Sequence, residues 1–380
     1  SNGSLTLNAD GSFTYVHDGS STVADSFTYK VNDGTVDGNT GELLHTLLNP
    51  NPRQKDNFGI SVALVGNLAI VGMWQNAFGE PDTARVHIFD ATTGQLLSSI
   101  ANPTPEVHDR FGGTVAANDT HLFIAATGDD TASLDAGAVY VYRYNTVTLE
   151  WALEAKLMPS DAESQDFFGW SVDLDGDVAI IGSYGNNDSG ENSGSAYIFR
   201  YDTITSMWTE EAKLLPANGE AHDGFGMSAA ISNDVAIIGA IRGDGIIPDS
   251  GSVYRFHFDG TSWNEEVEFY ASDSAPPDES GFNDSFGRPI ALSEGLVYVG
   301  AIFDDDRGIS SGSAYIFESS NATCCPADTN GNGEVSVFDL LELLSAWGAC
   351  PAPCPPDHNH DGFVNVTDLL KLLSSWGTCP

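Results

Sequence analysis

Basic residues are scarce in this chain. Fourteen Lys and Arg stand against 54 Asp and Glu over 380 residues, which gives a formal net charge of -40. Nucleic acids and anionic membrane surfaces bind proteins through clustered Lys and Arg, so we expect neither as a partner. The many carboxylates suit cations, above all calcium, although an acidic surface can also serve solubility alone.

The sequence also lacks long apolar runs and has few cysteines. No stretch of about 18 apolar residues occurs, so we expect no membrane span. All five cysteines follow residue 323, which excludes a disulfide scaffold for the rest of the chain. The first residues already alternate as a strand does and no signal peptide is recognisable, so we expect the chain to be a fragment.

An Asp-x-Phe-Gly signature recurs along the middle of the chain. Its phenylalanines follow one another at intervals of roughly 50 to 60 residues, a spacing typical of repeat architectures. They are Phe58, Phe111, Phe168, Phe225 and Phe286. Each interval contains four short strand candidates separated by turns, which predicts the four-stranded blades of a β-propeller. In such a blade Phe packs between neighbouring sheets and Gly permits close backbone approach.

These units, over residues 41–319, resemble the FG-GAP repeats of integrin α-chain propellers. The resemblance rests on Phe-Gly followed by Ser-Val, on apolar runs ending in Gly-Ala, and on Gly-Ser-Ala-Tyr-Ile-Phe at 194–199 and 312–317. It implies a propeller that presents recognition loops. Some family members carry a calcium loop after the first strand. Here that place holds tight turns such as 175–177, which are too short to surround a calcium ion.

The visible repeats are fewer than the blades of the integrin propeller. Residues 41–50 match residues 94–103, which form the fourth strand candidate of the first complete unit, whereas the last unit ends at Phe317 without such a strand. We therefore expect a five-bladed ring in which 41–50 completes the last blade and removes two exposed sheet edges. The alternative is an incomplete larger propeller.

Residues 1–36 precede the repeats and alternate with period two around a hairpin turn at 8–11. They resemble the end of a bacterial cadherin-like or VCBS-type β-sandwich domain. About three strands are too few to bury a two-sheet core, so we expect an incomplete domain.

The tail, residues 324–380, contains two loops with oxygen-bearing side chains at the spacing of a calcium-binding loop. Glu334 and Phe363 would contribute backbone carbonyls. The predicted ligands are Asp328, Asn330, Asn332, Glu334 and Asp339 in the first loop, and Asp357, Asn359, Asp361, Phe363 and Asp368 in the second. Two calcium ions are therefore the expected cofactors.

A helix with an apolar face is predicted after each loop. The apolar residues are Leu340, Leu341, Leu343, Leu344 and Trp347 in the first helix and Leu369, Leu370, Leu372, Leu373 and Trp376 in the second. Two such loop–helix units resemble a type I dockerin module. The resemblance implies docking to a cohesin-like module in either of two orientations. The expected contact residues are Val337, Phe338, Val366 and Thr367.

Cysteines flank both tail units. Cys325 and Cys354 precede the loops, Cys350 and Cys379 follow the helices, and Cys324 is left over. Their spacing is not that of a zinc site, so we expect disulfides formed in an oxidising compartment, with the pairing open.

No catalytic signature is recognisable, so we expect no catalytic residues. The carboxylates of the propeller loops are expected to be solvated loop tips: Asp129, Asp130, Asp188, Asp244, Asp304, Asp305 and Asp306. We expect a secreted, non-catalytic protein with a polysaccharide or cell-surface ligand on its propeller loops and a partner module on its tail. Two alternatives are open. One is an enzyme or component of a polysaccharide-degrading assembly, and the other is a surface adhesin whose tail is a structural calcium clip.

The second tail loop should bind calcium more tightly than the first, because it has one more carboxylate ligand. Calorimetry on Asp328→Ala and Asp357→Ala should show that the second change removes the stronger of the two sites. The opposite order would contradict this assignment.

Overall fold

The computed structural model describes residues 3–7, 13–17, 43–53, 56–74, 84–274, 284–293, 295–305, 310–318, 334–349, 363–374 and 377–378. The chain divides into two compact units, Ser1–Leu47 and Leu48–Pro380. In the first unit, β1 (Gly3–Leu7) and β2 (Phe13–His17) form an antiparallel hairpin. This confirms the first two strands expected there, and the strand candidate near residue 29 lies outside the described residues.

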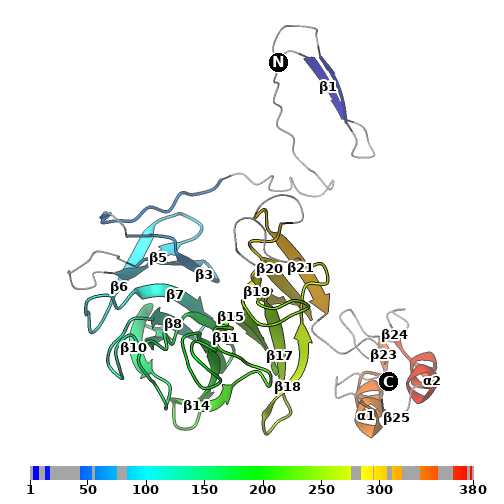
Figure 1. Cartoon of the computed structure of the whole chain (residues 1–380). Coiled ribbons are helices and arrows are strands. Elements are labelled where there is room, and N and C mark those ends of the chain that lie inside the picture. Colours follow the sequence, from blue (N-terminus) through cyan, green and yellow to red (C-terminus); the bar gives the residue numbers. More distant parts are fainter. Residues whose placement is uncertain are drawn as a thin grey trace. The chain divides into compact units, whose positions relative to one another are not determined.

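The repeats form five antiparallel sheets, which we call blades 1 to 5 (Figure 1). Blade 1 contains β3 (Ser61–Val65), β4 (Leu68–Gly72), β5 (Arg85–Asp90) and β6 (Leu96–Ala101). Blade 2 contains β7 (Phe111–Ala117), β8 (His121–Ala126), β9 (Ala138–Asn145) and β10 (Glu150–Leu157). Blade 3 contains β11 (Ser171–Asp175), β12 (Val178–Ser183), β13 (Ser195–Asp202) and β14 (Met207–Leu214). Blade 4 contains β15 (Phe225–Ser232), β16 (Val235–Ala240), β17 (Ser252–Phe258) and β18 (Trp263–Phe269). Blade 5 contains β19 (Phe286–Ser293), β20 (Leu296–Ala301) and β21 (Ser313–Glu318).

Within every blade the strands pair in chain order. Contacts between consecutive blades run mainly through the first strands, β3 to β7, β7 to β11, β11 to β15 and β15 to β19. The first strands are therefore innermost, as in a propeller.

The structure does not show the expected closing strand. Residues 43–49 have no strand conformation, and blade 5 has three strands within the described residues. The local alternation of 41–50 is that of a strand, but a strand exists only where a neighbouring edge pairs with it.

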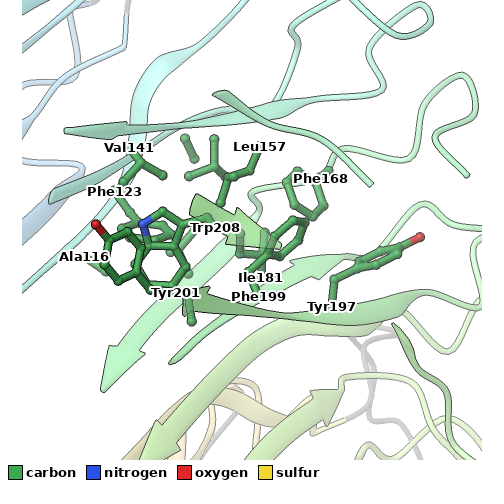
Figure 2. Close-up of a cluster of buried hydrophobic side chains, with 14 residues drawn as sticks. Ala116, Phe123, Val141, Leu157, Phe168, Ile181, Tyr197, Phe199, Tyr201 and Trp208 are labelled. Carbon is green, nitrogen blue, oxygen red and sulfur yellow. The ribbon is translucent and has the colours of Figure 1, made fainter. Parts of the chain in front are cut away.

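Apolar side chains from neighbouring blades interdigitate to form the core. Figure 2 shows the cluster between blades 2 and 3, in which Phe168 lies among residues of both sheets. The cluster includes Phe123 and Val141 of blade 2 and Ile181, Phe199 and Trp208 of blade 3. Burying one such aromatic side chain stabilises the fold by roughly 2 to 3 kcal/mol. The signature phenylalanine thus has the wedging role expected from the sequence.

The same signature also joins the blades through their backbones. The amide of Phe225 donates to the carbonyl of Ser193 in blade 3 at 2.9 Å, and the amide of Phe168 donates to Ala136 in blade 2 at 2.8 Å. In the other direction, the Ser171 hydroxyl donates to the Gly226 carbonyl of blade 4 at 2.9 Å. Each blade is therefore hydrogen-bonded to its successor at the start of the innermost strand.

The signature aspartate closes the turn that precedes this strand. The buried Asp109 carboxylate accepts the backbone amide of Glu106 at 2.7 Å, and Asp166 accepts that of Glu163 at 2.8 Å. Each of these bonds satisfies a loop amide. The aspartate thus has a structural role in the turn.

Two sheet faces remain exposed at the ends of the series. Val62 of blade 1 is 69% exposed, whereas the equivalent Val115 of blade 2 is 7% exposed. At the other end, Ile316 of blade 5 is 64% exposed, whereas the equivalent Ile198 of blade 3 is fully buried. The first and last blades therefore each present an apolar face of the kind that neighbouring blades bury.

Replacing Gly194 tests the backbone contact between blades. Gly194 has a positive φ of 84°, and an added Cβ would lie 2.6 Å from the Phe225 nitrogen. We expect Gly194→Ala to lower the free energy of unfolding by about 3 kcal/mol or more, measured by urea titration.

Gly260→Ala is the matched control. Gly260 has a similar φ of 92°, but no atom lies within 4 Å of the added Cβ. This variant should lose only about 1 kcal/mol, the cost of a left-handed conformation. Equal losses in the two variants would show that the contact between blades is unimportant.

Candidate functional site

The tail consists of two similar strand–helix units. Helix α1 (Val337–Ser345) follows β22 (Glu334–Val335) and precedes β23 (Gly348–Ala349). Helix α2 (Val366–Ser374) follows β24 (Phe363–Val364) and precedes β25 (Gly377–Thr378). The short strands pair across the two units, β22 with β25 and β23 with β24. The two helices expected from the apolar spacing are thus both present.

A small apolar core holds these units together. Val335 and Leu343 of the first unit pack with Val364 and Leu372 of the second, and all four are buried. Leu340 and Leu369 pack against them and are half-buried.

The expectation of one apolar face on each helix is wrong in part. Leu341, Leu344 and Trp347 in the first unit, and Leu370 and Leu373 in the second, are exposed. The reason is geometric, because one small core has room for one stripe of each helix and leaves the adjacent stripe outside.

The four residues expected to contact a partner are all on the surface. Val337, Phe338, Val366 and Thr367 begin the two helices and are exposed. The exposed leucines continue from them along the helices at spacings of three and four residues. These leucines were not predicted to contact the partner. Their spacing of three and four residues from the predicted contact residues nevertheless places them on the same side of each helix. We call these four residues and the exposed leucines of α1 and α2 the tail face: Val337, Phe338, Leu341, Leu344, Val366, Thr367, Leu370 and Leu373.

Two of the predicted carboxylate ligands, Asp339 and Asp368, have described side chains, and both are fully buried. The Asp339 carboxylate accepts the backbone amide of Ser336 at 2.8 Å, and Asp368 accepts that of Asn365 at 2.9 Å. In turn the Asn365 side chain accepts the amide of Thr367 at 2.8 Å. This reciprocal arrangement is a capping box at the start of each helix. The carboxylates therefore have a structural partner, and their burial at a helix start also suits a cation ligand.

The other predicted ligands can be placed only in part. Glu334 and Phe363 lie in the short strands β22 and β24. Outside the described residues lie Asp328, Asn330, Asn332, Asp357, Asn359 and Asp361, and also the five cysteines. In the described part of the chain no group of three or more His, Cys, Asp and Glu side chains has the spacing to hold a metal ion. The two calcium sites stay predictions.

The carboxylates of the propeller loops have structural partners. Asp129 and Asp304 are buried, and each accepts the hydroxyl of a strand tyrosine, Tyr140 and Tyr315 respectively, at 2.8 Å. The expectation that Asp129 and Asp304 are solvated loop tips is wrong. The hydrogen bond from the strand tyrosine holds each carboxylate in a buried position. Lys156 also forms an ion pair with Asp129 at 2.7 Å.

A second set of loop carboxylates closes the loop turns. The Asp130 carboxylate accepts the amide of Asp135 at 2.6 Å, and Asp244 accepts that of Asp249 at 3.0 Å. Asp244 belongs to an Arg-Gly-Asp sequence at 242–244. Because its carboxylate accepts the Asp249 amide, it is engaged within its own loop. Burial raises the pKa of the signature residue Asp223 to about 6, the hydrogen bond from the Glu220 amide opposes the rise, and the charge of Asp244 adds to it. These contacts give Asp129, Asp130, Asp244 and Asp304 a role in loop structure, whereas Asp306 lies outside the described residues.

Comparison with protein-family models identifies two families. A model described as FG-GAP repeat matches residues 103–142, 151–199, 208–256 and 263–317. A model described as Bacterial Ig domain matches residues 1–44. No curated protein matches the chain significantly. Among the described residues, neither helix has the length and apolar character to cross a membrane.

The Asp368→Asn variant separates the two roles of the buried carboxylate. The asparagine oxygen can still accept the Asn365 amide, but the negative charge is lost. We expect the helix content of the calcium-free protein to stay unchanged by circular dichroism and the calcium affinity to fall by about tenfold or more.

Asp368→Ala is the companion variant. It removes the acceptor as well as the charge, so both helix content and calcium affinity should decrease. Unchanged calcium binding in Asp368→Asn would leave the carboxylate with the capping role alone.

Proposed function

The chain belongs to the FG-GAP repeat family, and on this premise we propose that it is a secreted, non-catalytic binding protein whose tail docks onto a partner module. FG-GAP repeats together with a bacterial Ig domain fit an extracellular, adhesion-like protein. In this proposal the propeller presents recognition loops, and the tail is a dockerin-like module that binds two calcium ions.

The tail face is the observation that carries the docking proposal. Phe338 is 64% exposed, Leu341 is exposed one turn further along α1, and Leu370 is exposed at the position of α2 that corresponds to Leu341. A small module that keeps these side chains in water loses the free energy that their burial would supply, roughly 1.5 to 3 kcal/mol each. Exposed apolar patches of this kind mark interaction sites.

The duplication supports two docking orientations. Val337 corresponds to Val366 and Leu341 to Leu370, so the two helices present similar apolar residues. Calcium supports the helices, because ligands at the helix start and in the preceding loop share one ion. The partner is a cohesin-like module, since the loop and helix pattern resembles that of dockerins.

The docking proposal is tested by the affinity of the full chain for a panel of immobilised cohesin modules. Binding should require calcium and disappear in EDTA. Phe338→Asp or Leu370→Asp alone should leave Kd within about threefold, because the other helix can dock, whereas the double variant should weaken binding by about 100-fold or more.

Ile204→Asp is the control, since Ile204 is an exposed apolar residue of the propeller at 93% exposure. It should leave binding unchanged. If EDTA lowers only the melting temperature of the tail and no module binds, the tail is a calcium clip and the docking proposal fails.

We further propose that residues 43–48 complete blade 5 as its fourth strand and close the ring. The turn that follows a fourth strand is already present after these residues. Asn49 donates to Asp56 at 2.8 Å just as Asn102 donates to Asp109 at 2.6 Å after β6. Closure also covers the edge of β21 and brings the exposed faces of blades 1 and 5 together.

A designed disulfide tests this closure. In blade 1, Arg85 of β5 is opposite Ala101 of β6, and the sequence match makes Ser313 and Leu48 the equivalent pair. Cysteines at these two positions should form a disulfide under mild oxidation, detected by peptide mapping.

The shifted pair, Ser313→Cys with Leu47→Cys, should react poorly because the Leu47 side chain would point to the opposite face of the strand. Equal reactivity of both pairs, or of neither, would favour an incomplete larger propeller.

A further inference from the structure

One end of the innermost strands carries aromatic and arginine residues at positions that differ from blade to blade. The repeated Asp, Phe, Gly and Ser residues of the signature build the scaffold. Three other positions vary: the second residue of the signature, the residue after its glycine, and the residue just after the second strand. In this chain they hold Trp74, Arg110, Phe167, Trp170, Tyr184, Met227 and Arg288, among others.

Five of these side chains form a continuous stack across blades 1 to 3. The Arg110 guanidinium lies 5.5 Å from the Trp74 ring centre and 5.6 Å from that of Phe167. Phe167 stacks on Tyr184 with ring centres 5.3 Å apart and planes inclined by 8°. Trp170 contacts Tyr184 at 4.5 Å. All five are half-buried, so part of each remains accessible.

Arg288 of blade 5 stands directly after the signature glycine, as Trp170 does in blade 3. Its guanidinium lies 3.6 Å from the Met227 sulfur in blade 4, and its side chain is exposed. Burial raises the pKa of the Tyr184 hydroxyl, and the charges of Arg110 and Arg288 both oppose that rise. Two positive charges from different blades therefore act on the same tyrosine.

These two arginines differ from most other cations of the propeller. Lys156, Lys213, Arg143, Arg200 and Arg255 each form an ion pair with an Asp or Glu. None of the carboxylates that the structure describes forms an ion pair with Arg110 or Arg288. In a chain with 54 acidic and 14 basic residues, this leaves the charge of both arginines available to a ligand.

We propose that this aromatic–arginine cluster binds a glycan through an acidic sugar. Flat aromatic faces offer apolar surface to the C–H face of a sugar ring, and guanidinium groups bind carboxylate or sulfate oxygens with paired hydrogen bonds. The net charge of -40 disfavours densely charged polyanions such as nucleic acids. The best ligand is therefore an acidic sugar flanked by neutral ones. The inference rests on the proposed recognition role of the propeller and does not involve the tail.

Titration calorimetry of the full chain with three oligosaccharides tests the proposal. The probes are xylotriose carrying one glucuronate, a sulfated neocarratetraose, and neutral xylotetraose. An acidic probe should bind at least about tenfold more tightly than the neutral one, and comparison of the first two distinguishes carboxylate from sulfate recognition. Binding should be the same with and without EDTA, so a failure of tail docking would not affect it.

Arg288→Gln is the decisive variant, because its exposed side chain can change without disturbing the core. It should weaken binding of the acidic probe by about tenfold and leave binding of the neutral probe unchanged. Arg242→Gln removes the same charge from an exposed loop residue and should have no effect.

Three results would overturn the proposal. They are absence of binding to both acidic probes, equal affinity for the acidic and neutral probes, or unchanged affinity in Arg288→Gln. Preferential binding of a single-stranded oligonucleotide at the same arginine would also overturn it and point to a different ligand class.

Discussion

Close backbone contact between successive blades is the constraint on which the propeller depends. The amides of Phe168, Phe225 and Phe286 each donate a hydrogen bond to the preceding blade. The facing glycine, as at Gly194, has no Cβ to keep the chains apart. Once the backbones meet at this distance, the phenylalanine ring lies between the sheets and the buried aspartate closes the turn. Each residue of the signature therefore contributes to the contact between successive blades.

The Asp, Phe, Gly and Ser of the signature make the contacts between blades. The positions between these residues can therefore vary without disturbing those contacts. The second signature residue has a positive φ in Arg110 and Phe167, and its side chain points away from the joint toward the aromatic cluster. The same backbone that holds the blades together thus sets a ring of variable side chains at one end of the innermost strands. The loop carboxylates of Asp129 and Asp130, by contrast, form hydrogen bonds that shape the loops.

The tail differs from the propeller in that its core is small and leaves apolar side chains exposed. Val335, Leu343, Val364 and Leu372 are enough to bury one stripe of each helix and no more. The leucines on the adjacent stripe remain in water, and the duplication places them similarly on both helices. A capping aspartate starts each helix, and the same buried carboxylate is suited to a cation. Structural support and the proposed docking surface are therefore combined in the same few turns.

The repeats, their strands, the wedging phenylalanine and the two tail helices can be predicted from the sequence, because they depend on local periodicity and on residues that recur at fixed spacing. Tertiary structure decided the rest. It decided that Asp129 and Asp304 are buried beneath tyrosine hydroxyls, since those partners lie on a neighbouring strand, and that Leu341 and Leu344 are exposed, since the tail core has no room for them. It also brought Trp74, Arg110 and Phe167 together from three blades. Residues some 35 to 60 positions apart meet there only because neighbouring blades pack face to face with their first strands in contact, an arrangement that no local pattern encodes.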